Sequence, residues 1–154
     1  MSEAHFDLLR KMPIFGGLSD AALKLILEDA KVVDVAAGEY FFREGDAARS
    51  LFVLHAGTVA IERLWKDEPV ILGRLKHGDC IGEMSLIDMM PRSASVRAEE
   101  DCRSIEIGFS SLFKLYKREL EQYTMIIMNM GREVSRRLRR ADDRLFELKQ
   151  ETSR

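Results

Sequence analysis

Apolar residues recur at helical spacing near the start of the chain. Residues 7–12 form a short amphipathic turn, which Pro13 and the glycine pair at 16–17 interrupt. A second helix is predicted over 21–30, with its leucine and isoleucine side chains on one face. Ser19 is suited to cap it, because a serine hydroxyl can accept a hydrogen bond from a free N–H of the first turn. We therefore expect residues 1–30 to form an N-terminal helical segment.

Residues 31–109 change character, because short β-rich runs now alternate with turn signals about every ten residues. Most of the turns contain glycine. The runs predicted as strands are KVVDVA, EYFFRE, SLFVLHA, TVAIERLW, PVILGRL, SASVRA and CRSIEIG. Short, regularly spaced strands with glycine-rich turns are typical of a sandwich or jelly roll.

Residues 110–154 return to helical spacing and contain no proline. Ser110 is predicted to cap a short helix within a hinge at 110–117, and a longer helix is predicted to run to about Lys149. The apolar positions of the longer helix form a heptad seam with one four-residue stutter, made of Tyr123, Ile127, Met130, Val134, Leu138, Ala141, Leu145 and Leu148. The seam favours pairing with the same helix of a second copy, and packing on the β segment is the alternative.

The three segments together predict an α+β fold, in which a β jelly roll (a double-stranded β-helix) is flanked by N-terminal helices and a long C-terminal helix. The 154 residues are enough for one domain with its own core. With a net charge of −2, the domain as a whole is not expected to bind nucleic acid. The basic stretch of the long helix is interleaved with acids, which favours a solvated, salt-bridged face over a nucleic-acid or acidic-partner contact.

No apolar run approaches the roughly 18 residues that span a bilayer, and the first residues do not resemble a signal peptide. We therefore predict a cytoplasmic protein without a membrane span. Cys80 and Cys102 are expected to be buried, reduced thiols. The histidines at 5, 55 and 77 are scattered, and no metal site is predicted.

The segment from Ile81 to Val96, IGEMSLIDMMPRSASV, interrupts the β pattern and carries the candidate chemistry. Gly82 lets a ligand approach the backbone, and the first N–H groups of the helix-like piece that follows favour an anion. Arg92 is suited to a phosphate held by two oxygens, and Glu83 supplies an acceptor for a sugar hydroxyl. The residues alone indicate an anion site, with a sugar phosphate as one candidate ligand, or an ordinary turn.

The same segment resembles the phosphate-binding cassette of the cyclic-nucleotide-binding domain family, which includes catabolite activator proteins, kinase regulatory subunits and cyclic-nucleotide-gated channels. Gly-Glu at 82–83 and Pro-Arg-Ser-Ala-Ser-Val at 91–96 stand at the family's spacing. Glycines 38, 45, 57 and 78 fall at the family's turns, and the likeness spans 10–145. It implies a regulatory sensor, not an enzyme, that binds a cyclic nucleotide and transmits its presence through the C-terminal helix.

The resemblance also implies a role for individual residues. Arg92 would pair with the charge of the phosphate, and Glu83 would accept from the ribose 2′-hydroxyl. Ser93 would donate to the phosphate and could reach a base in the syn form. The remaining ligand contacts are expected from Gly82, Ser85, Leu86 and Ala94 in the cassette, and from Ile71 and Leu72 on a strand facing the base.

The base is less well specified than the phosphate. Activators of the family contact adenine through a Thr-Ser pair that follows an Arg-Arg-Leu run, and here Ala141 and Asp142 stand near that position. Asp142 could accept from guanine N1–H and N2–H₂, or it could be a solvated helix charge. A hydroxyl after the cassette arginine tends to suit cyclic GMP. Cyclic AMP is placed slightly ahead because it is the more frequent ligand in the family.

The chain ends at Arg154, which leaves no room for the winged helix-turn-helix of the activators. We therefore expect either a stand-alone sensor without a DNA-binding domain or a fragment of a larger protein, with an effector that the sequence does not identify. A ligand-free dimerisation module on the same fold is the alternative function. A cupin-type enzyme and an iron–sulphur or haem sensor, with His77 as the haem's axial ligand, are disfavoured by the absence of suitably clustered ligands.

Overall fold

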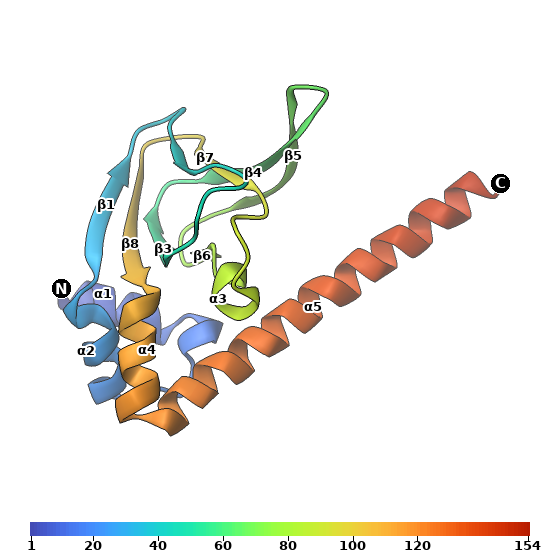
Figure 1. The fold of residues 1–154 in the computed structure, drawn as a ribbon. Helices are drawn as coiled ribbons and strands as arrows, with labels where there is room; N and C mark the ends of the chain where they lie inside the picture. The colour runs from blue at the N-terminus through green and yellow to red at the C-terminus, as the bar shows by residue number, and fades with distance from the viewer.

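The computed structural model describes residues 1–154 and contains a jelly roll of two antiparallel sheets with helices gathered at its base (Figure 1). The helical elements are α1 (Glu3–Arg10), the 3₁₀ turn η1 (Pro13–Phe15), α2 (Asp20–Glu28), α3 (Met84–Asp88), α4 (Phe109–Arg118) and α5 (Leu120–Thr152). The strands are β1 (Lys31–Val35), β2 (Tyr40–Phe42), β3 (Ser50–Ala56), β4 (Val59–Trp65), β5 (Glu68–Leu75), β6 (Cys80–Ile81), β7 (Ser95–Ala98) and β8 (Cys102–Gly108). The predicted fold class is confirmed.

The two sheets differ in what covers them. One has the strand order β1-β8-β3-β6 and the other β2-β7-β4-β5. In β3, Leu51 and Val53 belong to a core shared with the helices, whereas Phe52 and Leu54 belong to a core between the sheets. Because successive side chains of a strand point to opposite faces, β3 is buried on both sides. This double burial explains why SLFVLHA reads as a nearly continuous apolar run.

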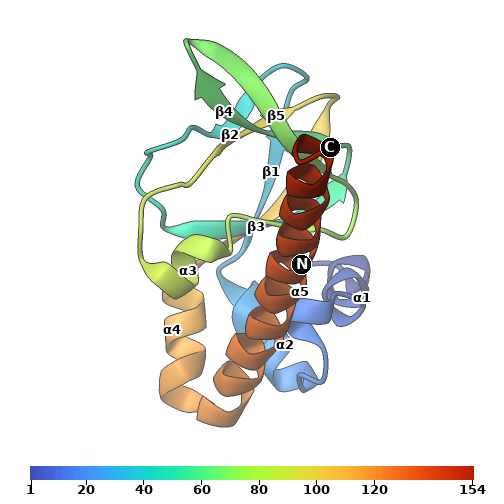
Figure 2. The same cartoon turned by 90° about the vertical axis from the view of Figure 1, so that its right-hand side faces the viewer.

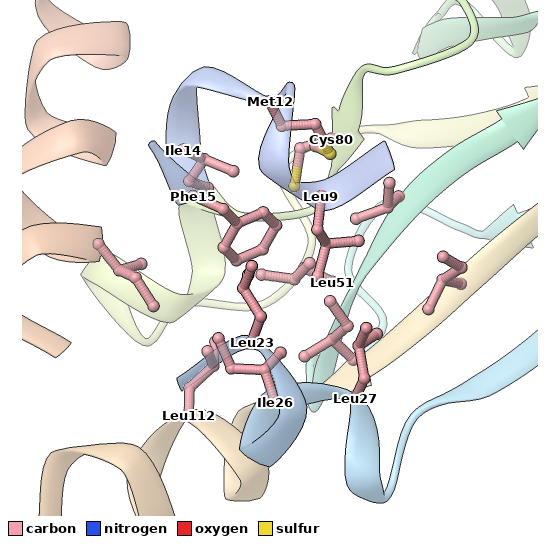
Figure 3. Close-up of a cluster of buried hydrophobic side chains, with 14 of the residues drawn as sticks. Leu9, Met12, Ile14, Phe15, Leu23, Ile26, Leu27, Leu51, Cys80 and Leu112 are labelled. Carbon is pink, nitrogen blue, oxygen red and sulfur yellow. The ribbon is translucent and has the colours of Figure 1, made fainter. Parts of the chain in front are cut away.

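The larger core joins the three predicted segments of the chain. Figure 3 shows Leu9, Phe15 and Leu23 of the N-terminal segment packed around Leu51 of β3 and Leu112 of α4. Met130 of α5 belongs to the same cluster. The N-terminal helices and the base of α5 are therefore fixed to one face of the roll by a common apolar core.

The first residues of α2 and α4 test the caps predicted at Ser19 and Ser110. Ser19 caps α2 as predicted, because its Oγ accepts from the backbone N of Ala22 at 3.1 Å. The prediction for Ser110 is wrong, since α4 begins at Phe109 with Gly108 at the cap and no side-chain cap. The physical reason is that β8 passes directly into α4, and the N–H of Phe109 is satisfied by the carbonyl of Arg49.

The two halves of α5 have different surroundings. Met130 is buried and Ile127 is packed against the larger core, whereas Leu138 and Leu145 are 60% and 53% exposed. Figure 1 shows the C-terminal half projecting clear of the β-roll, and Figure 2 shows the helix crossing in front of it. The first half of the seam thus packs on its own domain, and the second half has no partner within the chain. No helix combines the length and the apolar character that crossing a bilayer requires.

Two glycines with positive φ allow a matched test of the β3–β4 turn. Gly57 has φ +94°, and a Cβ there would lie 2.7 Å from the Asp101 carbonyl oxygen and from Cys102 Sγ. Gly38 has φ +87° but open space around it. We expect Gly38→Ala to lower the free energy of unfolding by about 1–2 kcal/mol through strain alone, and Gly57→Ala to lower it by about 1–3 kcal/mol more through the clash. Urea denaturation measures both, and equal losses would contradict the packing of this turn.

Candidate functional site

The segment from Ile81 to Val96 leaves the sheet, forms one short helix and returns. Gly82, at φ +82°, turns the chain out of β6 and into α3. Met89 ends α3 in the left-handed conformation, and the Asp88 carboxylate accepts from the N–H of Met90 at 2.9 Å. These turns bring the chain back toward β7 with Arg92 at its start.

The returning chain is anchored to the loop between β2 and β3. The N–H of Arg92 donates to the carbonyl of Asp46, and the Arg92 carbonyl accepts from the N–H of Gly45, both at 2.9 Å. Ser95 Oγ accepts from the N–H of Glu44 at 2.8 Å. The backbone of Arg92 is therefore positioned by a segment more than forty residues earlier in the chain. Gly45 in that segment has φ +88°, a conformation that favours glycine.

The Arg92 side chain is buried, with 5% of the residue exposed. Its Nη1 donates to the carbonyl of Gly82 at 3.1 Å, and its Nη2 donates to the carbonyl of Ser50 at 2.8 Å. The guanidinium carbon lies 4.0 Å from the ring centroid of Phe42, which is a cation–π contact. A Cβ at position 82 would collide with Nη1, so glycine is favoured there by close approach as well as by φ.

The charge of Arg92 has no counter-ion within the protein. Burial lowers the pKa of its guanidinium, and only the more distant Glu106 and Asp46 oppose that shift. No salt bridge includes Arg92, and its buried Nε has no hydrogen-bond partner. A buried cation with an unpaired donor is costly unless a charge reaches it. This position therefore suits an anion with two or more acceptor oxygens.

Glu83 is the second buried charge of the site, and it does have a partner. Arg137 of α5 donates from Nη1 to Glu83 Oε1 at 2.5 Å. Burial acts to lower the pKa of Arg137, but the Glu83 carboxylate outweighs it and the pKa is raised. The glutamate side chain is 7% exposed and the arginine 40%. The long helix is thus joined to the cassette by an ion pair that is shielded on one side.

A cavity lies between these charges and the second sheet. The volume of this cavity is about 80 Å³. Its lining joins both charges to apolar strand residues, and consists of Phe42, Ile61, Leu75, Cys80, Ile81, Gly82, Glu83, Met84, Ser85, Arg92, Ser93, Ala94, Val96 and Arg137. The strand residues of the lining are therefore apolar, and its charged side chains come from the cassette and from α5.

The structure brings together most of the residues named from the sequence. Gly82, Glu83, Ser85, Arg92, Ser93 and Ala94 all line the cavity. Leu86 packs instead against the larger core. Ile71 and Leu72 lie outside the lining and are 41% and 60% exposed; Leu75 of the same strand and Ile61 of β4 stand in the cavity wall. β5 is the edge strand of its sheet, so its outer part is open to solvent.

Asp142 is exposed on α5 and does not line the cavity. The residue of α5 that does is Arg137, which the sequence pattern assigns to a solvated basic stretch. Arg137 follows the buried Met130 by seven residues, or two helical turns, so it lies on the face that packs on the domain. A cationic side chain at a position that continues the buried face of a helix indicates that an acidic partner lies opposite it.

Both cysteines are free and buried, as predicted. Burial raises the pKa of the Cys80 thiol well above its ordinary value, and the nearby Glu83 adds to the shift. Cys80 thus lines the cavity as an uncharged group. No cluster of three or more His, Cys, Asp or Glu side chains is arranged to hold a metal ion.

Comparison with known proteins places this geometry in one family. The sequence pattern of the cyclic nucleotide-binding domain matches residues 32–119, more than half of the chain. Among curated relatives, a cAMP-dependent protein kinase regulatory subunit of Emericella nidulans is 31% identical over 65% of this chain and 24% of its own length. A CRP-like cAMP-activated global transcriptional regulator of Mycobacterium tuberculosis is 26% identical over 92% of this chain and 62% of its own length.

Solved structures agree on the fold. The catabolite activator protein of Thermus thermophilus is 30% identical with a TM-score of 0.75, covering 88% of this chain and 62% of that one. A cyclic nucleotide-binding domain from Methylobacillus flagellatus has a TM-score of 0.79 at 22% identity, covering 94% of this chain and 82% of that one. The chain spans less than two thirds of the length of the curated relatives named above. With the cassette, the roll and the flanking helices all in place, the chain belongs to the cyclic nucleotide-binding domain family.

Proposed function

We propose that this chain is a regulatory sensor that binds a cyclic nucleotide in the cavity beside Arg92 and transmits its presence through α5. The observation that carries the proposal is the buried guanidinium of Arg92, which lacks a counter-ion and has an unpaired Nε. A cyclic phosphate supplies both a negative charge and several acceptor oxygens. Its binding would offset the cost of burying the arginine.

The ribose would lie on Glu83. Within the protein only Oε1 of that carboxylate is bonded, to Arg137, so Oε2 remains to accept from the 2′-hydroxyl. A carboxylate is a stronger acceptor than a neutral oxygen. In this proposal Arg137 positions Glu83. Binding of the ribose to Glu83 would therefore act on the ion pair that holds the long helix.

The base would contact the apolar wall formed by Ile61 and Leu75, with Ser93 at the open side. We propose cyclic AMP as the ligand, with cyclic GMP as a close second. The named relatives that support cyclic AMP come from Emericella nidulans and Mycobacterium tuberculosis. A cGMP-dependent protein kinase of Toxoplasma gondii, 37% identical over 59% of this chain and 9% of its own length, supports the second choice.

The guanine-reading role considered for Asp142 would require α5 to move. Asp142 is five residues beyond Arg137, which turns it about 140° away on the helix at roughly 100° per residue. Ala141, four residues beyond, faces the same side as Arg137 but offers no polar group. The selectivity for the base therefore rests mainly on Ser93 and on the strand residues in this proposal.

The transmission step would use the exposed half of α5. Val134, Leu138, Leu145 and Leu148 lie on one stripe and are 37–60% exposed. A helix of this kind is stabilised when it pairs with a copy of itself. We propose a homodimer through this stripe. The alternative function, a ligand-free dimerisation module, is favoured by the same stripe but leaves the unpaired Arg92 unexplained.

The first prediction concerns Arg92. Arg92→Ala should reduce the affinity for cyclic nucleotide at least tenfold, because truncating a buried charge partner costs about 2–5 kcal/mol. Calorimetric titrations with cyclic AMP and with cyclic GMP measure the loss and also rank the two ligands. Arg74→Ala, which removes an exposed arginine bound to Glu99, should leave both affinities unchanged. Unchanged affinity in Arg92→Ala refutes the assignment, and a parent protein that binds neither nucleotide supports the ligand-free module.

The ion pair between Glu83 and Arg137 can be measured by a double-mutant cycle. Glu83→Gln, Arg137→Met and the double variant should give a coupling of at least about 1 kcal/mol in the free energy of unfolding, because the pair is partly buried. The exposed pair Arg144–Glu147 is the control, with an expected coupling below about 0.5 kcal/mol. Additive effects at Glu83 and Arg137 would show that the helix is not fixed to the cassette by this contact.

The pairing of α5 predicts a defined oligomeric state. The parent chain should sediment as a dimer, and Leu138→Glu should sediment as a monomer because it places a charge in the apolar stripe. Gln150→Glu adds the same charge on the opposite face of the helix and should leave the dimer intact. Sedimentation velocity at several concentrations distinguishes these cases. A monomeric parent or a dimeric Leu138→Glu variant would rule out this interface.

A further inference from the structure

The three histidines of the chain, which are far apart in sequence, meet where α1 contacts the roll. His5 comes from α1, His55 from β3 and His77 from the turn before β6. The rings of His5 and His55 meet edge to face with centroids 5.2 Å apart, and those of His55 and His77 are 6.2 Å apart. The proposed nucleotide site uses none of these side chains, so the cluster needs its own explanation.

His5 takes part in the cap of α1 as a hydrogen-bond acceptor. Its Nδ1 accepts from the backbone N–H of Ser2 at 3.0 Å, in the reciprocal arrangement of a capping box. A backbone N–H can only donate, so this Nδ1 must be unprotonated. Adding a proton to His5 therefore removes the acceptor as well as adding a charge. The bond from the Ser2 backbone N–H requires the neutral imidazole, whereas Ser2 Oγ, which lies 2.9 Å from the same Nδ1, can accept from the charged ring.

His55 places a second imidazole against the first with its own ring nitrogen unpaired. Its Nδ1 is buried and has no hydrogen-bond partner. The backbone carbonyl of His55 accepts from Nδ1 of His77, which holds the third ring beside the other two. A carbonyl can only accept, so Nδ1 of His77 is the donor in this bond, and the bond does not involve the cap of α1. The ring whose contact to the α1 cap is lost on protonation is thus that of His5.

The charged groups that face His5 all disfavour its protonation. They are the amino terminus on its own segment and Arg103 on β8, together with His55 on β3 when that ring is charged. Asp34 of β1 is bound by Arg103 at 2.8 Å, and Asp79 beside His77 accepts from the N–H of Lys76. Burial is the largest cause and His55 the next in lowering the pKa of His5 below its ordinary value of 6.5.

We propose that His5, packed against His55, forms a pH-sensitive latch that holds α1 on the β-roll when the His5 ring is neutral and releases it on acidification. The unfolded helix binds more protons than the docked one at pH values below 6.5, so docking is fully stable above that value and is weakened as the pH falls through it. The latch is independent of nucleotide binding.

Release of α1 would affect the contacts that fix the base of the long helix. Leu9 of α1 and Met130 of α5 share the larger core. Asn129 of α5 donates from Nδ2 to the carbonyls of Ile14 and Gly16, which follow α1 directly. Loosening the N-terminal segment would therefore weaken two contacts that fix α5. If α5 carries the output of the proposed sensor, the latch adds a response to pH that does not involve Arg92.

Hydrogen exchange of the whole chain tests the latch. Protection factors corrected for intrinsic rates should fall about threefold or more for the amides of α1 between about pH 7.5 and about pH 5.5, while those of the β3–β8 ladder stay constant. His5→Gln keeps an acceptor suited to a capping box but cannot titrate, so the protection of α1 should become independent of pH. His77→Gln is the matched control and should keep the response of the parent.

Two results would overturn the proposal: protection of α1 that is flat in the parent, or a fall in His5→Gln equal to that of the parent. Should His5→Gln loosen α1 even at neutral pH, NMR titration of the imidazole Cε1–H signals in the parent decides the matter. The latch requires His5 to titrate below its ordinary value of 6.5 in the folded protein, and a value at or above it excludes the device.

Discussion

The buried guanidinium of Arg92 is the group around which the site is built. It is held by one carbonyl from the cassette and one from β3, and it lies over an aromatic ring from β2. Carbonyls orient a cation, but they do not cancel its charge. Glycine at position 82 is favoured by its φ of +82°, and a side chain there would displace the guanidinium from its position. The fold thus tolerates an uncompensated charge in the place where an anionic ligand gains most from it, which is typical of functional sites.

The ion pair between Glu83 and Arg137 extends the site to the long helix. The first turns of α5 are fixed by the core that Met130 shares with the N-terminal segment, and Arg137 adds a polar attachment two turns later. Beyond that point no apolar contact with the roll holds the helix. A helix fixed at its base and at one ion pair can change its position when either attachment changes. This arrangement is the structural basis of the proposed transmission through α5.

Much of the fold follows from local spacing. The run at 50–56 coincides with β3, because burial on both faces leaves an apolar side chain at nearly every position. Ser19 caps α2 because a capping bond involves only neighbouring residues. Ser110 does not cap α4, because the preceding strand continues directly into the helix and Arg49 satisfies the free N–H. The N-terminal part of the heptad seam is periodic because it packs on its own domain.

The cassette could be found in the sequence because its residues lie within one short segment, from Ile81 to Val96, and its glycine, glutamate and arginine have a characteristic spacing. Contacts between residues far apart in the sequence were decided only by the tertiary structure. Arg137 reaches Glu83 across 54 positions, and Ser50 meets Arg92 across 42. Leu75 lines the cavity, whereas Ile71 and Leu72 do not, because the cavity meets only one end of an edge strand. Local spacing determines which face a residue lies on, whereas the packing of helices on sheets determines what that face meets.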